Sequence, residues 1–408
     1  MDPHRIYRDF ATDVLVDILG RLPPKTRRRL RLVCRHWRYV VDRRTPTDMR
    51  SRAKTLVVAT GSAYVVDDLS APGMIRGLWA NFHTARRFLA MSVVGTCNGL
   101  VCLCDGREPG GAITVANPAT GEALTIPPLP LPPPCTVTNE QDIGSNSTNL
   151  WHQAYSFVYL QTTERYKIVH VPCHVDRFVF DAVHVFTLGE PSWRDVPAGP
   201  AARCDPGHGV VSVDTASATA TYWATPEGTA KVMSFDLEDE RVTSVMPLPS
   251  MLSNPKEGSS WHLAEVQGRL GIVVRRGSSL KTEVWVMEGT TRGYHIKWSR
   301  WYIVQMSSML RRLTRPTFVH GGHVLTWGWW RCGKQGSVLC RHTPSDDIAE
   351  AKRGVVELGE RNLGTVVARI DMADDDRRTY GYIETKEPLS VYLHAGGSTC
   401  LISWDWNP

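Results

Sequence analysis

Residues 10–41 read FATDVLVDILGRLPPKTRRRLRLVCRHWRYVV, and this stretch has the apolar spacing of two short helices. Its apolar residues form two groups: Val14, Leu15, Ile18, Leu19 and Leu22, then Leu30, Val33, Cys34, Trp37 and Val41. Both groups follow the i, i+3, i+4, i+7 spacing that puts side chains on one helical face. Thr12 is a suitable N-cap for the first helix, and Pro23 predicts its end because proline lacks a backbone donor.

Two helices of this length cannot bury both apolar stripes against each other, because a unit of about 40 residues has too little core. The unburied part of the stripe therefore predicts a protein partner. We interpret the stretch as a docking module.

The stretch resembles the F-box, the helical motif that docks on Skp-type adaptors of cullin-based ubiquitin ligases. The match runs through Asp13, Leu15, Ile18, Leu19, Arg21, Leu22, Pro23, Lys25, Leu30, Arg31, Val33, Cys34, Arg35 and Trp37. It departs at Phe10-Ala11, where the family usually has Leu-Pro, and at Arg27-Arg28, where a leucine is usual. The resemblance implies adaptor binding by Phe10, Val14, Leu15, Ile18, Leu19, Leu22, Pro23, Leu30, Val33, Cys34 and Trp37.

Positive charge is concentrated at the start of the chain. Residues 1–54 hold 15 Lys/Arg against 6 Asp/Glu, whereas the rest holds 32 against 35. The cluster between Lys25 and Arg31 suits an acidic protein partner, a nuclear import signal or nucleic acid. We favour a solvated or adaptor-facing helix surface, because Skp-type adaptors are acidic as a family.

Length and composition indicate an ordinary folded protein. The chain has 408 residues, 42% of them hydrophobic, which suffices for one small and one large β domain. No run of about 18 apolar residues predicts a membrane span, and the charged start predicts no secretory signal. The ten cysteines have no CxxC spacing and are expected to be reduced, mostly buried thiols. We expect an intracellular protein of the nucleus, the cytoplasm or both.

From about Thr55 onward, short runs rich in Val, Ile, Thr, Tyr and Trp alternate with Gly, Pro, Asn and Asp. This pattern is typical of many short strands. Because no helical segments separate the runs, a parallel α/β fold is excluded, and a propeller or two sandwiches remain.

Internal repeats favour the propeller. Residues 117–130 (NPATGEALTIPPLP) and 236–249 (DLEDERVTSVMPLP) share a turn, a strand and a Pro-Leu-Pro exit at an offset of 119 residues. A second pair is VHVFTL followed by Trp193 and VWVM followed by Trp298, and a third is Asn98-Gly99 with Gln267-Gly268 before apolar strands. At about 45–50 residues per blade, six or seven blades are expected. We expect Trp193, Trp223, Trp285 and Trp298 to pack between blades.

The same phrases resemble the plant F-box-associated domain, which is propeller-like or kelch-like. They include GTCNGLVCL (95–103), VANPATGE (115–122), ERYKIVHV (164–171), TYWAT (221–225) and MSFDLEDE (233–240). We therefore expect an α+β chain: an F-box at 1–50, a linker at 51–58, and an antiparallel β-propeller at 59–408. The resemblance implies a non-catalytic substrate receptor of an SCF-type ubiquitin ligase, which binds a Skp-type adaptor, through it a cullin, and a target protein.

Candidate chemical motifs carry little weight. GWWRCGKQ (328–335) lacks the hydroxyl and the following helix of a phosphate-binding loop. His170, Cys173 and His174 lack a matching pair of ligands, so we expect no metal and no cofactor. The proline-rich run 127–134 is expected to be a mobile loop, with a PxxP ligand as the alternative. Trp327, Trp329, Trp330 and Arg331 break the tryptophan rhythm and are candidates for substrate capture.

Two other functions remain open. A nucleic-acid-binding regulator would use the basic helix and show a steep salt dependence of binding. A carbohydrate-binding or carbohydrate-processing propeller would need carboxylates that converge at one mouth.

Overall fold

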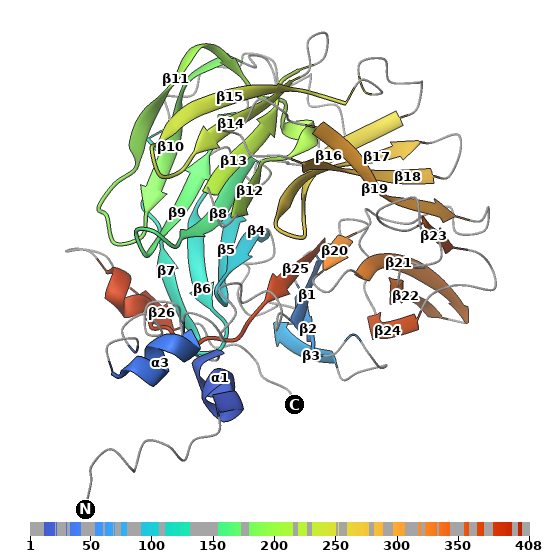
Figure 1. The fold of residues 1–408 in the computed structure, drawn as a ribbon, viewed down its shortest axis with the longest axis horizontal. Coiled ribbons are helices and arrows are strands. Elements are labelled where there is room, and N and C mark those ends of the chain that lie inside the picture. Colours follow the sequence, from blue (N-terminus) through green and yellow to red (C-terminus); the bar gives the residue numbers. More distant parts are fainter. Residues whose placement is uncertain are drawn as a thin grey trace, which may run out of the picture.

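The computed structural model describes two helices followed by a ring of β-sheets (Figure 1). The described residues are 12–20, 22, 30, 33–41, 54–59, 62–67, 69, 75–79, 91–105, 111–130, 154–172, 179–214, 219–226, 231–249, 252, 259–276, 281–288, 297–306, 317–319, 323–332, 334–342, 355–358, 365–370, 378–393 and 399–401. The helices are α1 (Thr12–Gly20) and α3 (Arg35–Tyr39). Thr12 is thus the first residue of α1, while Pro23 lies outside the described residues.

The described strands form six sheets, each named here by its order along the chain. Sheet 1 contains β1 (Lys54–Ala59), β2 (Ser62–Val66), β3 (Ile75–Trp79) and the late strand β25 (Arg378–Tyr382). Sheet 2 contains β4 (Met91–Cys97), β5 (Leu100–Asp105), β6 (Ile113–Asn117), β7 (Glu122–Thr125) and the late strand β26 (Thr399–Leu401). Sheet 3 contains β8 (Tyr155–Leu160), β9 (Arg165–His170), β10 (Val179–Thr187) and β11 (Arg194–Arg203).

The other three sheets follow in the same manner. Sheet 4 contains β12 (Val211–Asp214), β13 (Thr219–Ala224), β14 (Lys231–Asp236) and β15 (Arg241–Pro247). Sheet 5 contains β16 (Ser259–Val266), β17 (Arg269–Arg276), β18 (Lys281–Glu288), β19 (Lys297–Met306) and β23 (Val355–Leu358). Sheet 6 contains β20 (Thr317–Val319), β21 (His323–Cys332), β22 (Lys334–His342) and β24 (Thr365–Ile370).

One strand from each sheet faces the centre of the ring. The inner strands β4, β8, β12, β16, β20 and β25 contact one another in this order, and β25 contacts β4 again. The ring is therefore closed, and its sheets surround a common centre in Figure 1. The prediction of a small helical module followed by a mostly β, propeller-like domain is confirmed.

Two details differ from the predictions. The domain is not wholly antiparallel, because β23 pairs with β19 in parallel, with Ile303 opposite Val355. The expected linker 51–58 ends too late, because strand β1 already begins at Lys54 and pairs with both β2 and β25. Leu56 and Val57 are both fully buried, one on each face of sheet 1, so the run is continuously apolar and gives no alternation that would mark where the strand begins.

The repeated turn residues have a local physical cause. Asn98-Gly99 joins β4 to β5 with φ values of 50° and 85°, and Gln267-Gly268 joins β16 to β17 with 51° and 76°. Two successive residues with positive φ form the tight hairpin turn that matches strand twist. The glycine at the second position avoids the Cβ penalty of that conformation.

The 119-residue offset relates sheet 2 to sheet 4, which are two positions apart in the ring. In sheet 2, the backbone N–H of Ala119 donates to Asn117 Oδ1 at 3.0 Å. In sheet 4, the N–H of Glu238 donates to Asp236 Oδ1 at 2.8 Å. Both side chains thus stabilise the same kind of turn, since Asn and Asp accept from backbone two residues on.

The repeated tryptophans hold neighbouring sheets together. Trp193, from sheet 3, donates its indole N–H to the Pro127 carbonyl after sheet 2 at 2.8 Å. Trp298, from sheet 5, donates in the same way to the Pro247 carbonyl at the end of sheet 4 at 3.1 Å. Trp223 is fully buried. Packing between blades, as predicted for these three, is confirmed.

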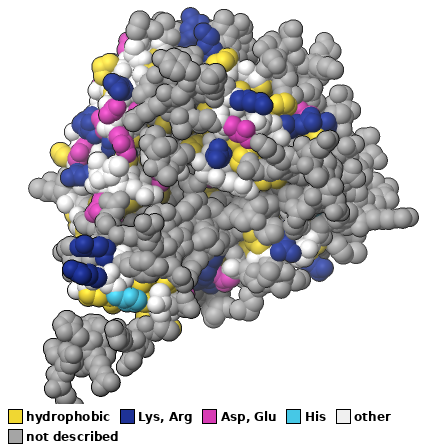
Figure 2. Space-filling model, viewed as in Figure 1, with side chains coloured by type: hydrophobic (Ala, Val, Ile, Leu, Met, Phe, Trp, Pro, Cys, Tyr) yellow, Lys and Arg dark blue, Asp and Glu magenta, His cyan; other side chains and the backbone are white. Residues whose placement is uncertain are grey.

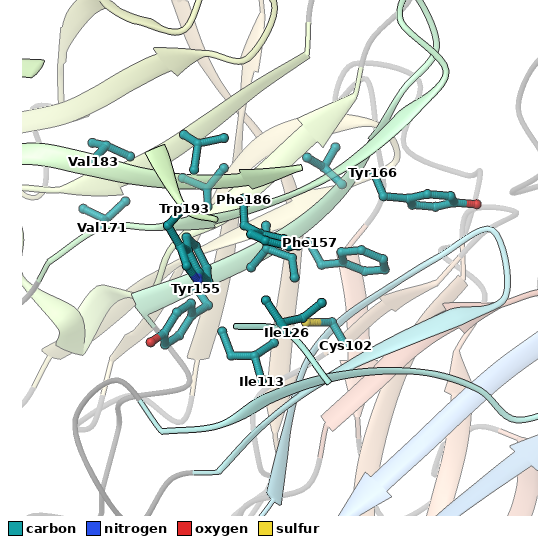
Figure 3. Close-up of a cluster of buried hydrophobic side chains, with 14 of the residues drawn as sticks. Cys102, Ile113, Ile126, Tyr155, Phe157, Tyr166, Val171, Val183, Phe186 and Trp193 are labelled. Atoms are coloured by element: carbon teal, nitrogen blue, oxygen red, sulfur yellow. The ribbon is translucent and has the colours of Figure 1, made fainter. Parts of the chain in front are cut away.

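The largest core cluster lies between sheets 2 and 3 (Figure 3). It includes Cys102, Ile126, Phe157 and Phe186, and burial of each such side chain stabilises the fold by about 1.5–3 kcal/mol. Leu129 is buried in the same cluster. The described part of the proline-rich run, residues 127–130, is therefore anchored to the core at Leu129, while Pro128 and Pro130 are exposed.

Candidate functional site

The helical module has a small core of its own. Leu15 and Leu19 of α1 are buried with Val40, and the half-buried Val16, Leu22, Leu30, Trp37 and Val41 pack around them. Cys34 caps α3, since its Sγ accepts the N–H of Trp37 at 3.5 Å. Of the predicted docking residues, Leu15 and Leu19 thus serve the internal core first.

Three apolar side chains of the module remain exposed. Val14 and Ile18, one helical turn apart on α1, are 48% and 41% exposed, and Val33 is 50% exposed. Among the described residues, the other exposed large hydrophobic side chains are Val391 and Leu393, both in the β domain. Figure 2 shows apolar, basic and histidine side chains together at the lower left, over the region of α3. An exposed apolar group rimmed by charge is typical of a protein interface. We call Val14, Ile18 and Val33 the apolar face.

Phe10 and Pro23 lie outside the described residues, so the structure does not test their predicted role. The basic segment from Lys25 to Arg29 also lies outside them. The sequence spacing identified the apolar face but could not separate it from the core, because both stripes share the same period.

The tryptophan candidates lie in one long strand. Trp327, Trp329, Trp330 and Arg331 are in β21, where Trp329 pairs with Ser337 and Trp330 with Gly336. Their side chains lie outside the description, so substrate capture stays a prediction. The phosphate-loop interpretation of this segment is excluded, since Lys334 begins strand β22 where such a loop requires a helix.

The candidate metal ligands do not converge in the described part of the chain. His170 is buried in β9, with its ring 4.5 Å from that of Tyr155 and 5.4 Å from that of His184. Cys173 and His174 lie outside the description. Among the described residues, no three His, Cys, Asp or Glu side chains are grouped to hold a metal ion.

The described cysteines behave as core residues. Cys102, Cys104, Cys204 and Cys340 are buried, and the six cysteines whose side chains are described, which also include Cys34 and Cys97, are free thiols. Burial raises the pKa of Cys104 to about 12 and that of Cys340 to about 11. Such thiols do not ionise at neutral pH, so they are poor nucleophiles.

One end of the ring carries a dense charge network. We call this end the turn face, because the hairpins after the inner strands lie there, including Asn98-Gly99 and residues 161–164. The ammonium of Lys167 is buried and donates to Glu240 Oε1 at 2.7 Å and to the Leu237 carbonyl at 2.6 Å. Arg194 donates to the same carboxylate at 2.8 Å. The network joins sheets 3 and 4.

The two cations control the charge of Glu240. Burial alone would raise the pKa of this carboxyl, but the hydrogen bonds from Arg194 and Lys167 outweigh burial and lower the pKa. In return, the hydrogen bond to Glu240 raises the pKa of Arg194. Glu240 and Arg194 therefore stay charged at neutral pH, and the network links two blades.

The closing segment, residues 383–393, crosses the same face after β25. Its Glu387 is buried and accepts from the hydroxyls of Tyr166, at 2.9 Å, and Tyr392. Asn117 donates to the Glu387 carbonyl at 2.8 Å, and Glu122 accepts the N–H of Leu389 at 2.8 Å. Sequence analysis missed these residues, because nothing in the local pattern around Glu387 indicates contacts more than 200 positions away.

The chain thus joins a small helical module to a closed ring of sheets. No helix within the described ranges is long and apolar enough to cross a membrane.

Two solved structures show a distant likeness to the chain. A putative 6-phosphogluconolactonase from Bacteroides uniformis is 10% identical with a TM-score of 0.38, over 80% of this chain and 99% of that one. An α-L-arabinofuranosidase from Lactobacillus brevis is 11% identical with a TM-score of 0.36, over 66% of this chain and 93% of that one. Likenesses at these TM-scores have no bearing on function.

Sequence relatives are more informative. The F-box protein At3g07870 of Arabidopsis thaliana is 23% identical over 385 residues, which are 86% of this chain and 85% of that protein. The probable F-box protein At3g25550 of the same plant is 32% identical over 115 residues, which are 28% of this chain and 59% of that protein.

Family models match both parts of the chain. The F-box domain matches residues 9–48, which include α1, α3 and the apolar face. The F-box associated beta propeller domain matches residues 76–324, more than half of the chain, from β3 into β21. The chain therefore belongs to the plant-type F-box proteins that carry an F-box associated beta propeller domain.

Proposed function

We propose that this protein is the substrate-recognition subunit of an SCF-type cullin ubiquitin ligase. The observation that carries the proposal is the exposed apolar face of Val14, Ile18 and Val33, within the F-box match, on helices whose other apolar residues are already packed. A Skp-type adaptor covers this face and links the protein to the cullin. Basic residues around it, such as Arg35 and Arg38 of α3, suit an acidic adaptor.

The β domain captures the target protein. Each of the six sheets acts as one blade of a rigid platform, and the F-box at residues 1–50 joins this platform at β1. The protein contributes no catalytic group. It raises the effective concentration of a target lysine near the ubiquitin-conjugating enzyme. The tryptophans at 327, 329 and 330 with Arg331 contribute to capture, and the complex works in the nucleus, the cytoplasm or both.

The test is a pull-down of the full chain on a purified Skp-type adaptor. Ile18→Asp places a charge on the apolar face, whereas Leu19→Asp would break the module's core, because Leu19 is fully buried. In the complex, Ile18→Asp removes an isoleucine that the adaptor would cover and buries a carboxylate in its place. The binding free energy should fall by about 3 kcal/mol or more, which is roughly a hundredfold weaker binding.

The matched control is Val391→Asp, which makes the same change at an apolar side chain that is 61% exposed on the β domain. It should bind the adaptor as the native chain does. If folded Ile18→Asp protein is retained as well as the control, the apolar face is not the docking surface and the proposal fails.

A further inference from the structure

One face of sheet 5 carries a group of charged and aromatic side chains on its strands β18 and β19 (Figure 1). Glu283 is only 3% exposed, and its Oε1 lies 3.0 Å from Lys281 Nζ and 3.6 Å from Arg300 Nη1. The indole N–H of Trp285 donates to Glu283 Oε2 at 3.5 Å. The Arg300 guanidinium lies over the Trp285 ring, with its Cζ 5.9 Å from the ring centroid. We call these four residues the Arg–Trp cluster.

The Arg–Trp cluster has a surplus of positive charge. Lys281 and Arg300 both pair with Glu283, and no other carboxylate among the described residues pairs with either cation. The side chain of Arg300 is 46% exposed, so part of its fork of five N–H donors is open to solvent. Two cations on one carboxylate leave a net charge of +1, which suits one monovalent anion.

An internal repeat shows which residues the fold requires at this place. VHVF (183–186) in sheet 3 and VWVM (284–287) in sheet 5 occupy the third strands of their sheets. Each is followed by a tryptophan, Trp193 or Trp298, whose indole N–H donates to the carbonyl of a proline at the end of the preceding sheet. These shared residues form the framework of the two corners.

The Arg–Trp cluster lies at positions where the two corners differ. In sheet 3 His184 lies opposite Asp195, and in sheet 5 the same places are taken by Trp285 and Arg300. His184 Nδ1 lies 2.7 Å from Asp195 Oδ1, and this pair has no surplus of positive charge. Two positions before His184, sheet 3 has Ala182 in place of the buried carboxylate. Because sheet 3 forms the same corner without these side chains, the fold does not require the cluster.

The aromatic side chains of this corner are also less covered in sheet 5 than in sheet 3. Trp193 is 7% exposed, and its ring lies 5.4 Å from that of Phe186. Trp298, opposite Met287, is only half-buried, and Trp285 is half-buried as well. Tryptophan and arginine are enriched among the residues that dominate binding at protein interfaces. Two half-buried indoles beside an exposed guanidinium are therefore suited to a protein partner.

We propose that the Arg–Trp cluster binds a segment of the target protein in which one Asp or Glu stands beside an apolar residue. The inference rests on the proposed function and names a site and a chemistry for capture. The carboxylate pairs with Arg300, because a planar guanidinium binds a carboxylate through two parallel hydrogen bonds. The apolar neighbour packs against the half-buried rings of Trp285 and Trp298.

The size of the surplus charge favours a carboxylate over other anions. A phosphorylated side chain carries about −1.5 to −2 charges, which exceeds what a net charge of +1 balances. Double-stranded DNA presents a negative charge about every 1.7 Å along its axis and requires a row of cations. The Arg–Trp cluster instead combines one surplus charge with aromatic surface, as a single carboxylate on an apolar segment requires.

The test follows binding of the blocked peptide acetyl-Gly-Ser-Leu-Glu-Phe-Ser-Gly-amide to the full chain by NMR of the tryptophan indole N–H groups. Trp285→Phe identifies the Trp285 resonance, and comparison peptides carry glutamine or phosphoserine in place of glutamate. Arg300→Gln removes the surplus charge. Its matched control is Arg269→Gln, because exposed Arg269 lies over Trp301 at 5.7 Å on the opposite face of the same sheet.

A second variant, Glu283→Gln, should have the opposite effect from Arg300→Gln. It removes the carboxylate that competes for both cations and raises the net charge of the cluster to +2. The glutamate peptide should therefore bind this variant more tightly than the native chain. A purely structural role of Glu283 predicts no such gain. The remaining indole resonances show whether each variant is folded.

We expect the glutamate peptide to shift the Trp285 resonance of the native chain. Arg300→Gln should raise Kd at least about tenfold, which is the contribution of a hydrogen bond to a charged group, and Arg269→Gln should leave it unchanged. The absence of a shift at millimolar peptide, equal binding of the glutamine peptide or tighter binding of the phosphoserine peptide would overturn the proposal. So would equal effects of the two arginine changes, or weaker binding by folded Glu283→Gln. No adaptor is present in this assay, so its failure is distinguishable from failure of the adaptor pull-down.

Discussion

Removal of the Glu240 carboxylate should destabilise the propeller by leaving a buried ammonium without its counter-ion. Lys167 and Glu240 are only 8% and 18% exposed at their side chains, and Arg194, the third member, is 43% exposed. In Glu240→Ala, Arg194 can return to water, but Lys167 keeps only the Leu237 carbonyl as partner. The change therefore isolates the cost of one buried charge.

The size of the effect follows from this geometry. Breaking one side of a buried pair costs about 3–5 kcal/mol, and the remaining carbonyl contact with partial solvent access puts Glu240→Ala near 3 kcal/mol. In Lys167→Met/Glu240→Ala both charges are gone, and an apolar chain of similar length fills the site. The free energy of unfolding of the double variant is then about 1–2 kcal/mol below that of the native chain, mainly because the Leu237 carbonyl has lost its donor.

The double variant is thus expected to be more stable than the single variant that it contains. Urea unfolding followed by tryptophan fluorescence measures both free energies, since the chain has 14 tryptophans. The folded pKa of Glu240 is depressed, so its stabilising effect is full above the ordinary value of 4.5 and is lost as the pH falls below it. The difference in free energy of unfolding between the native protein and Glu240→Ala should therefore be smaller at pH 3 than at neutral pH. A double variant less stable than Glu240→Ala would refute the reasoning.

Two further changes test other parts of the scaffold. Gly99→Ala should lower the free energy of unfolding by about 2–3 kcal/mol, because a Cβ at φ 85° would meet the Ile383 carbonyl and Thr385 of the closing segment. Gly189→Ala, at φ 94° with open space around it, should lower it by about 1 kcal/mol. Equal unfolding midpoints of the two variants in urea would contradict this. Burial lowers the pKa of His342 to about 4, so the protein should lose up to about 3 kcal/mol of stability as the pH falls from 6.5 toward 4. His342→Gln should reduce this dependence of stability on pH, as measured by the melting temperature at each pH.

Sequence predicted those parts of the fold that depend on near neighbours. The turns at Asn98-Gly99 and Asn117 involve contacts within three residues, so residue type alone indicates them. The Pro-Leu-Pro segment after sheet 2 and the tryptophan that binds beside it could also be recognised, because each recurs in the sequence as a short local motif. Their pairing, Trp193 with Pro127, spans 66 positions and required the structure.

Features that depend on distant segments escaped prediction. The late strands β25 and β26 join the two earliest sheets, and neither differs in local pattern from any other short strand. The parallel β23 illustrates the same limit, since strand direction is set by where the chain returns rather than by side-chain alternation. In the F-box, spacing found all the apolar positions, but the division between Leu19, buried, and Ile18, exposed, depends on where Val40 packs.

Ring closure links the two halves of the proposed function. A receptor raises effective concentration only if the target is held at a defined distance and angle from the adaptor. The F-box continues into β1, and β1 is fixed by β25 on one side and by the Lys54–Glu384 contact at 3.5 Å. Without β25, sheet 1 would lose its inner-strand contacts with β4 and β20 and would keep only the packing of its two faces against sheets 2 and 6. The position of β1, the first strand after the F-box match, therefore depends on residues beyond position 378, which lie outside the propeller family match.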